Sequence, residues 1–194
     1  YAGTNDINRM LSVGMLIKKA MKGQLDLIGP ATAVGEELLG IPDFAIPDFS
    51  APLSQEKHIL KNLKKVFLMI AGAGVQKYGT ELEEHQQLLL AVADILIEVY
   101  MAESAVLRAE KNIGVYGLEA QEHQVALSQL YLYQAVEKIS TKGREAILGF
   151  AEGDEQKALL MGLKRFTKYM EYPNVIALRN KVAEKLTAEN VYCF

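Results

Sequence analysis

The residues at the start of the chain are the ones whose types and spacing could bind a ligand. Gly3 permits close approach to the backbone, and Thr4 and Asn5 are both favourable N-cap residues. Asp6 suits the positive end of a helix dipole, and the apolar residues after it recur at helical spacing. A helix start with free N–H groups and polar side chains can bind a phosphate group. Capping the helix is the commoner use of such residues, so the pattern leaves both readings open.

The nine opening residues resemble a known motif. YAGTNDINR, residues 1–9, is similar to the Y/F-E-G-T-N-[DE]-I-x-R segment of the acyl-CoA dehydrogenases. In that family the residues after the Gly contact FAD and begin the last helix of the catalytic bundle. The resemblance implies that Thr4, Asn5 and Asp6 are FAD contacts here. Arg9 matches a frequent Arg of the motif, and no role is assigned to it.

The motif departs from the family at the position of the catalytic base. The family has a Glu that takes the α-proton of an acyl-CoA thioester, and this chain has Ala2, whose methyl group cannot accept a proton. Three explanations stay open: a base on an earlier helix, an engineered change at the end of a shortened chain, or an inactive parent protein. No catalytic residue is therefore named in this chain.

A weaker resemblance extends along the chain. Residues 21–27 and 150–166 are similar to the appended helical domain of long bacterial acyl-CoA dehydrogenases of the very-long-chain type. This implies three parts: the end of the catalytic helical bundle at 1–40, a Pro-rich linker at 41–53, and an appended C-terminal helical bundle at 54–194.

Apolar periodicity predicts helices throughout the chain and no strand. The expected fold is an all-α antiparallel helical bundle. Gly29-Pro30 is interpreted as a break, Ser54 as a helix cap, and Pro173 as a first-turn residue of the last helix. Gly72 and Gly74 are expected to permit close helix packing. The expected helices are 5–22, 31–39, 54–78, 81–112, 118–151, 154–169 and 173–190.

Composition bounds the partners and the compartment. The chain has 194 residues and a net charge of −3, and no basic face stands out, so we expect no nucleic-acid partner. Cys193 is the single cysteine and makes no intramolecular disulfide, which fits a reducing compartment and predicts a cytoplasmic location. Lysine runs at 18–22 and 57–65 are explained as solvated helix faces. The alternative interpretation is that they bind an anionic CoA or membrane surface.

The histidines and the acidic residues of the chain have simpler explanations than a metal site. A di-iron site needs Glu-x-x-His on two helices, and none of the three histidines has a Glu three residues before it. We therefore expect no metal, and interpret Glu81 with His85 and Glu119 with His123 as exposed pairs. Acidic residues inside an apolar stretch are expected to form buried salt bridges with Arg or Lys; they are Asp94, Glu98 and Glu103.

Two functions follow. In the first, the chain is the C-terminal fragment of an FAD-dependent acyl-CoA dehydrogenase that converts a fatty acyl-CoA to the trans-2-enoyl-CoA in β-oxidation and passes electrons to an electron-transfer flavoprotein. The fragment alone is then expected to be inactive. In the second, the bundle is a non-enzymatic module for homo-dimerisation or for docking to a membrane or partner. The second is motivated by apolar residues outside the helical stripes, namely Phe44, Phe49, Val191, Tyr192 and Phe194.

Overall fold

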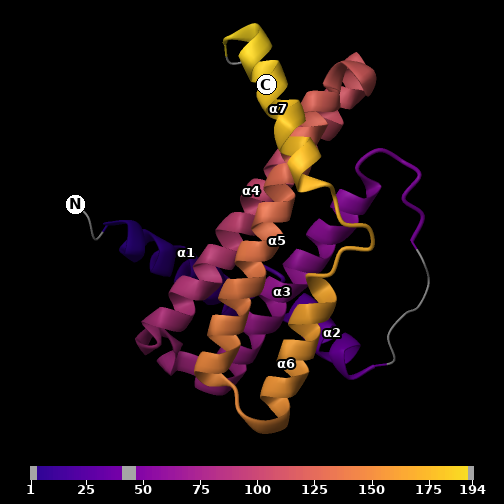
Figure 1. Ribbon diagram of the computed structural model, residues 1–194. Helices are drawn as coiled ribbons and strands as arrows, with labels where there is room; N and C mark the ends of the chain where they lie inside the picture. The colour runs from indigo at the N-terminus through magenta and orange to yellow at the C-terminus, as the bar shows by residue number, and fades with distance from the viewer. Residues whose placement is uncertain (1–3, 41–46, 192–194) are drawn as a thin grey trace.

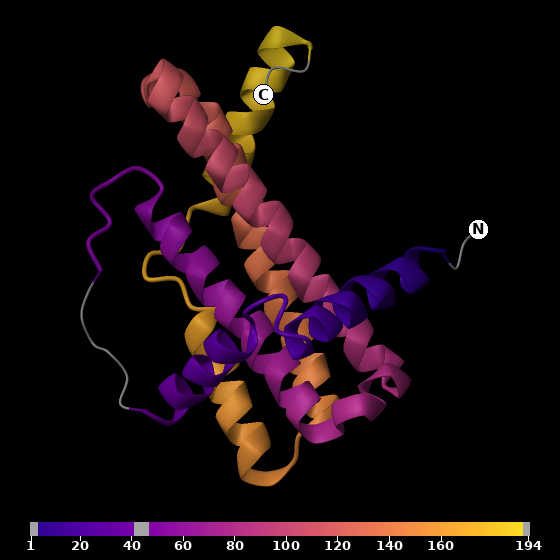
Figure 2. The same cartoon turned by 180° about the vertical axis from the view of Figure 1, so that it is seen from behind.

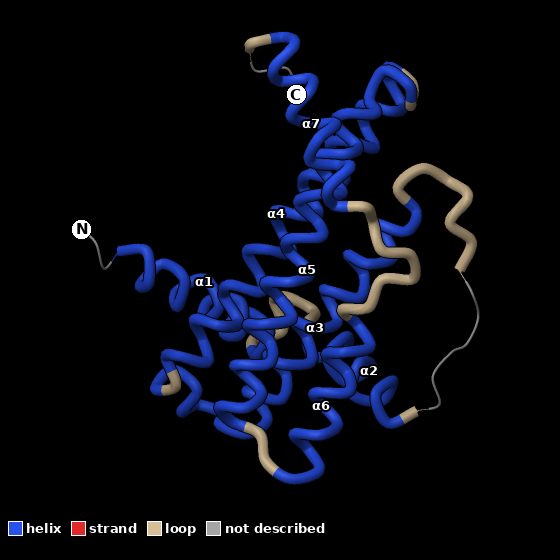
Figure 3. The backbone as a smooth tube through the Cα atoms, viewed as in Figure 1, coloured by secondary structure: helices blue, strands red, loops and turns tan. Residues whose placement is uncertain are grey.

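The structure is a computed structural model that describes residues 4–40 and 47–191. Within these residues every regular element is a helix and no strand occurs (Figure 3). The predicted all-α fold is confirmed. The α-helices are α1 (Thr4–Met21), α2 (Ile28–Leu39), α3 (Ser54–Tyr78), α4 (Gln86–Tyr116), α5 (Glu122–Phe150), α6 (Gly153–Phe166) and α7 (Val175–Glu189), with short 3₁₀ helices η1 (Gly79–Glu84) and η2 (Glu119–Gln121).

Four helices form an up-and-down bundle. α3, α4, α5 and α6 run in alternating directions, and α4 lies along α5 as a long hairpin (Figure 1). α6 closes the bundle against α3 and α5, and α7 packs on α5 near the free end of that hairpin. Seen from behind, α1 lies across α4 and α2 lies against α3 (Figure 2). The expected antiparallel arrangement is thus observed.

One apolar core joins these helices. Val13 of α1 and Val34 of α2 belong to the same cluster of buried residues as the centres of α3, α4 and α5. Glycines of α3 permit two of the contacts, as expected: a Cβ on Gly72 would lie 3.3 Å from Ala31 Cβ of α2, and one on Gly74 would lie 3.3 Å from Leu88 Cδ2 of α4. The division of the chain at 41–53 stays a prediction.

Three helix starts differ from the sequence interpretation. Pro30 does not break the chain, because α2 begins at Ile28 and the first-turn position of Pro30 needs no backbone donor. Ser54 is the first residue of α3 and not its cap; its hydroxyl donates to the Ala51 carbonyl oxygen at 2.6 Å. Pro173 lies before the last helix, whose cap is Asn174.

The predicted helix 81–112 is also wrong at both ends. Residues 79–84 form η1, and α4 begins only after His85, whose φ of −87° and ψ of 61° are not helical. At the other end Gly114 lies inside α4, which continues to Tyr116. Gly117 ends the helix with a φ of 84°, a value that a residue with a Cβ rarely adopts.

Part of the Pro-rich segment is described. Phe49 is half-buried, and its ring meets the ring of His58 edge-on with centroids 5.6 Å apart. Phe49, named above among the apolar residues outside the helical stripes, thus packs against His58 of α3. Phe44 lies outside the described residues, as do Ala2 and Cys193.

Candidate functional site

The first turn of α1 contains the three residues that the motif singles out. Thr4, Asn5 and Asp6 are all exposed and lie where α1 projects beyond the rest of the bundle (Figure 2). The first N–H groups of a helix have no partner within it, so this turn offers free backbone donors beside a hydroxyl and an amide. The three residues lie on one turn, and their side chains point in different directions around the helix.

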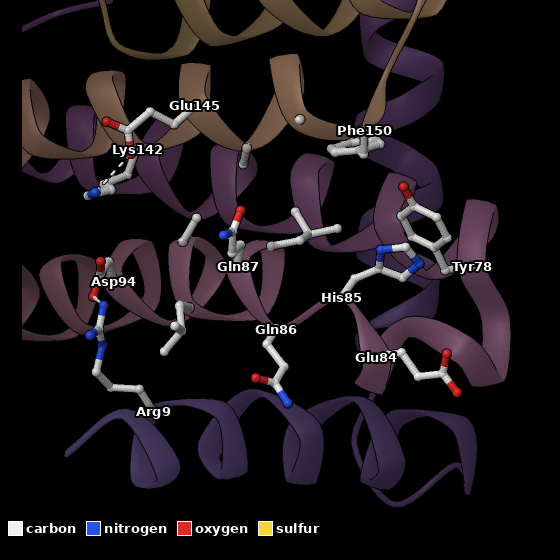
Figure 4. A pocket seen from close by; sticks show the side chains of 15 residues that line it. Arg9, Tyr78, Glu84, His85, Gln86, Gln87, Asp94, Lys142, Glu145 and Phe150 are labelled. Atoms are coloured by element: carbon white, nitrogen blue, oxygen red, sulfur yellow. Dashed lines mark hydrogen bonds and ion pairs between the residues drawn. The ribbon is translucent and has the colours of Figure 1, made fainter. Parts of the chain in front are cut away.

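Arg9 connects this turn to the bundle. Its Nη1 lies 2.9 Å from Asp6 Oδ1, and its Nη2 forms an ion pair with Asp94 Oδ1 of α4 (Figure 4). The Nε atom of Arg9 is buried and has no hydrogen-bond partner among the described residues. Asp6 and Arg9 have the sequence spacing of a helical pair, whereas Asp94 lies 85 positions after Arg9 and no local pattern points to it.

Acidic residues within α4 form the ion pairs that were expected of them. Besides the pair of Asp94 with Arg9, Glu98 pairs with Lys138 at 2.7 Å and Glu103 with Lys64 at 2.5 Å. Tyr131 also donates to Glu98, at 3.1 Å. The three carboxylates are partly exposed, however, and not buried as predicted, because each lies at the edge of the stripe that packs in the core.

A pocket of about 710 Å³ opens between α4 and α5, with Arg9 of α1 at one end. Figure 4 shows Lys142 and Glu145 on one side of it and the stacked rings of Tyr78 and His85 at the far end. The ring centroids of that stack are 3.5 Å apart. The pocket is thus lined by side chains of both charges, namely Arg9 and Lys142 with Asp94 and Glu145.

The charges at the near end of the pocket influence one another. Lys142 donates to Glu145 at 2.8 Å, and this hydrogen bond is the main cause that raises the pKa of Lys142 above its usual value. The negative charge of Asp94 raises the pKa of Lys142 further, and the positive charge of Arg9 opposes it. Asp94 is therefore placed between two cations.

The histidines have other partners than the sequence suggested. His58 shares a hydrogen bond of 3.1 Å with Asn62, and His85 stacks on Tyr78. His123 lies 3.8 Å from Glu122 and does not pair with Glu119, because Glu119 belongs to the separate turn η2. No group of three metal-ligating side chains occurs in the described part of the chain.

One side of α1 is apolar and uncovered. The helix packs on α4 through Val13, which is fully buried, whereas Ile7, Leu11 and Met15 are 60%, 54% and 48% exposed. These three residues follow one another at intervals of four and so lie on one face. A helix with apolar residues on two faces usually has a neighbour on each.

Comparison with known proteins identifies the family. The model of the family described as "Acyl-CoA dehydrogenase, C-terminal domain" matches residues 62–165, which is more than half of the chain. The chain belongs to the acyl-CoA dehydrogenase family. This confirms the family that the resemblance indicated.

Two acyl-CoA dehydrogenases show how much of such a protein this chain spans. A "Probable acyl-CoA dehydrogenase" of Bacillus subtilis (strain 168) is 36% identical over 185 residues, which make up 94% of this chain and 30% of that protein. The crystal structure of an acyl-CoA dehydrogenase complexed with FAD from Bacillus anthracis has a TM-score of 0.89 and 34% identity, and covers 98% of this chain and 31% of its own. The chain thus spans about a third of the length of these relatives.

No helix within residues 4–40 and 47–191 combines the length and apolar character needed to cross a membrane.

Proposed function

We propose that this chain is the C-terminal part of an FAD-dependent acyl-CoA dehydrogenase, and that Thr4, Asn5 and Asp6 contact the flavin at the edge of its catalytic unit. The observation that carries the proposal is the start of α1, which presents these three residues beside the uncovered stripe of Ile7, Leu11 and Met15. The relatives are about three times longer than the chain, so they contain a large part that such a stripe can pack against.

The residues at this turn fit a flavin contact. Thr4 offers a hydroxyl, Asn5 an amide and the helix start free N–H groups, all of which can hydrogen-bond the polar atoms of FAD. Asp6 already accepts a hydrogen bond from Arg9, so its side chain is held in place and its charge is offset. When bound, FAD would supply the acceptor for the hydride that leaves the β-carbon of a fatty acyl-CoA.

In the reaction we propose, a fatty acyl-CoA becomes the trans-2-enoyl-CoA of fatty acid β-oxidation, and an electron-transfer flavoprotein takes up the electrons. The base that removes the α-proton would come from outside this chain, because residue 2 is Ala. The chain alone is then inactive. We also propose a cytoplasmic location, for which the support is the single cysteine of the sequence.

Two samples test the proposal. Mixed with FAD and a fatty acyl-CoA, the isolated chain should bleach no flavin absorbance, whereas the longer protein that contains it should. Within the longer protein, Thr4→Val should raise the Kd for FAD by about three- to tenfold, the effect of one lost hydrogen bond. Thr32→Val is the matched control, because the Thr32 hydroxyl donates to the Ile28 carbonyl oxygen of its own helix, at 3.0 Å. Flavin bleaching by the isolated chain would contradict the proposal.

A non-enzymatic docking role is the second candidate. Its support is a set of exposed apolar side chains around the turn between α4 and α5, where Val115, Tyr116 and Leu118 are 64%, 65% and 47% exposed. This turn lies at the free end of the hairpin (Figure 1). We propose that this end serves as a contact for a second copy of the chain or for a lipid surface. Light scattering and liposome flotation test this role. A chain that is monomeric and does not bind liposomes would contradict it.

A further inference from the structure

Arg9 marks the point at which α1 leaves the bundle. All five residues from Thr4 to Asn8 are exposed, Arg9 and Met10 are half-buried, and Val13 is completely buried. Among the described residues of α1, apolar contact with the core therefore begins at Met10, which packs against the buried cluster. The turn that contains Thr4, Asn5 and Asp6 depends on what Arg9 contacts.

The partner of Arg9 is rigidly placed. Asp94 lies in α4 between Ala93 and Ile95, both of which are completely buried. Its backbone is thus fixed by the core, and only its side chain reaches toward α1. A carboxylate on such a segment is a firm anchor for a group on a helix that crosses it.

The guanidinium of Arg9 links Asp94 to the first turn of α1. One nitrogen bonds Asp94 (Figure 4), and another bonds Asp6, which is one helical turn closer to the N-terminus. Because the guanidinium is a rigid plane, its two nitrogens fix the two carboxylates relative to each other. Within the described residues no other side-chain hydrogen bond or ion pair joins α1 to the bundle; the bond of the Ser12 hydroxyl stays within α1.

We propose that Arg9 is a positioning residue through which Asp94 of the bundle sets the orientation of the α1 turn that contacts FAD. This inference rests on the proposed function. Through Arg9, the bundle then affects flavin affinity although it is remote in sequence from the flavin contacts. Arg9 itself touches neither flavin nor substrate in this scheme.

Hydrogen exchange of the chain tests the positional part. Asp94→Asn removes the charge and keeps the shape of the side chain. We expect the backbone amides of residues 8–12 to exchange at least threefold faster in this variant, because the start of α1 frays more often. The matched control is Glu103→Gln on the same helix α4, which removes an ion pair made with Lys64 of α3 and not with α1. Equal exchange in the two variants would overturn the inference.

Flavin binding by the longer protein tests the functional part. Asp94→Asn should raise the Kd for FAD about fivefold and alter the visible absorption spectrum of the bound flavin, whereas Glu103→Gln should change neither. Arg9→Lys is the second variant: it keeps the charge, but an ammonium lacks the planar fork that holds both carboxylates, so it should weaken FAD binding similarly. Thermal melts of all variants separate this effect from general destabilisation.

The outcomes are distinct. An unchanged Kd in Asp94→Asn, or an equal change in Glu103→Gln, would overturn the positioning role while leaving the proposed function intact. A longer wild-type protein that binds no FAD would overturn the proposed function, and the hydrogen-exchange comparison would still decide whether Asp94 holds the start of α1.

Discussion

Gly143 is the place where a single added methyl group should reveal how closely the bundle is packed. The residue is buried in the C-terminal half of α5, where α6 and α3 approach it. A Cβ at this position would lie 2.8 Å from Leu163 Cδ1 and 3.2 Å from Ile70 Cδ1. Both side chains are almost completely buried, at 3% and 0% exposure, so neither has free space to move into. Gly143→Ala therefore overpacks the core.

The expected magnitude combines two opposing effects. Overpacking of a dense core costs about 1–3 kcal/mol, and replacing Gly by Ala inside a helix returns about 1 kcal/mol through lower conformational entropy of the unfolded chain and better helix propensity. The net change is a loss of about 1 kcal/mol in the free energy of unfolding, or about 2–4 °C in Tm for a chain of this size.

Gly149 supplies the control on the same helix. A Cβ there would meet nothing within 4 Å, so Gly149→Ala keeps only the favourable effect, about 0.5 kcal/mol near a helix end. Urea unfolding followed by circular dichroism measures both variants against the wild type. The reasoning is refuted if Gly143→Ala is as stable as Gly149→Ala, because the two sites would then be packed alike.

Three further predictions concern pH and helix ends. Burial lowers the pKa of His58 below its usual 6.5. As the pH drops below 6.5, His58 is therefore protonated more readily in the unfolded chain than in the folded one, and the free energy of unfolding falls. His58→Gln should flatten the resulting decline in urea midpoints between about pH 7 and pH 5. Burial and the nearby Glu98 raise the pKa of Tyr131 from 10.0 to about 12. Above pH 10 the phenol ionises in the unfolded chain before it does so in the folded one, so the free energy of unfolding falls as the pH rises. An ultraviolet titration of Tyr131→Phe should show one fewer tyrosine that ionises near pH 12. Asn174→Ala removes the side-chain acceptor of the Ala177 N–H group, at 3.0 Å, and should cost about 1 kcal/mol, measured as faster amide exchange in α7, whereas Asn174→Asp should keep the cap.

The helix pattern of the fold was largely readable from the sequence. Gly79 lies between the expected helices 54–78 and 81–112, and Gly117 lies between 81–112 and 118–151; each has a positive φ at the end of its helix. The errors lie where tertiary structure overrides local preference. Leu53, and not the better capping residue Ser54, occupies the cap of α3, because its side chain is buried in the core even though its φ of 60° is unusual for Leu.

The sequence predicted only those parts of the site that lie within a single helix. The motif located Thr4, Asn5 and Asp6 on a helix start, where the structure also has them, and their contact with FAD stays a prediction. The partner of Arg9 was not readable, since sequence spacing reports neighbours within a helix and not a contact between crossing helices. The signal for Asp94 was its place in an apolar stretch, which correctly predicted an ion pair but could not name the cation.

The ion pair of Arg9 with Asp94 also has a consequence for synthesis on the ribosome. The two residues are 85 positions apart, so at about 5–20 residues per second α1 emerges on the order of ten seconds before the helix it docks on. During that interval both apolar faces of α1 are without the bundle. A nascent chain in this state would be a client for chaperones unless the protein translated ahead of it is already folded and covers the face formed by Ile7, Leu11 and Met15.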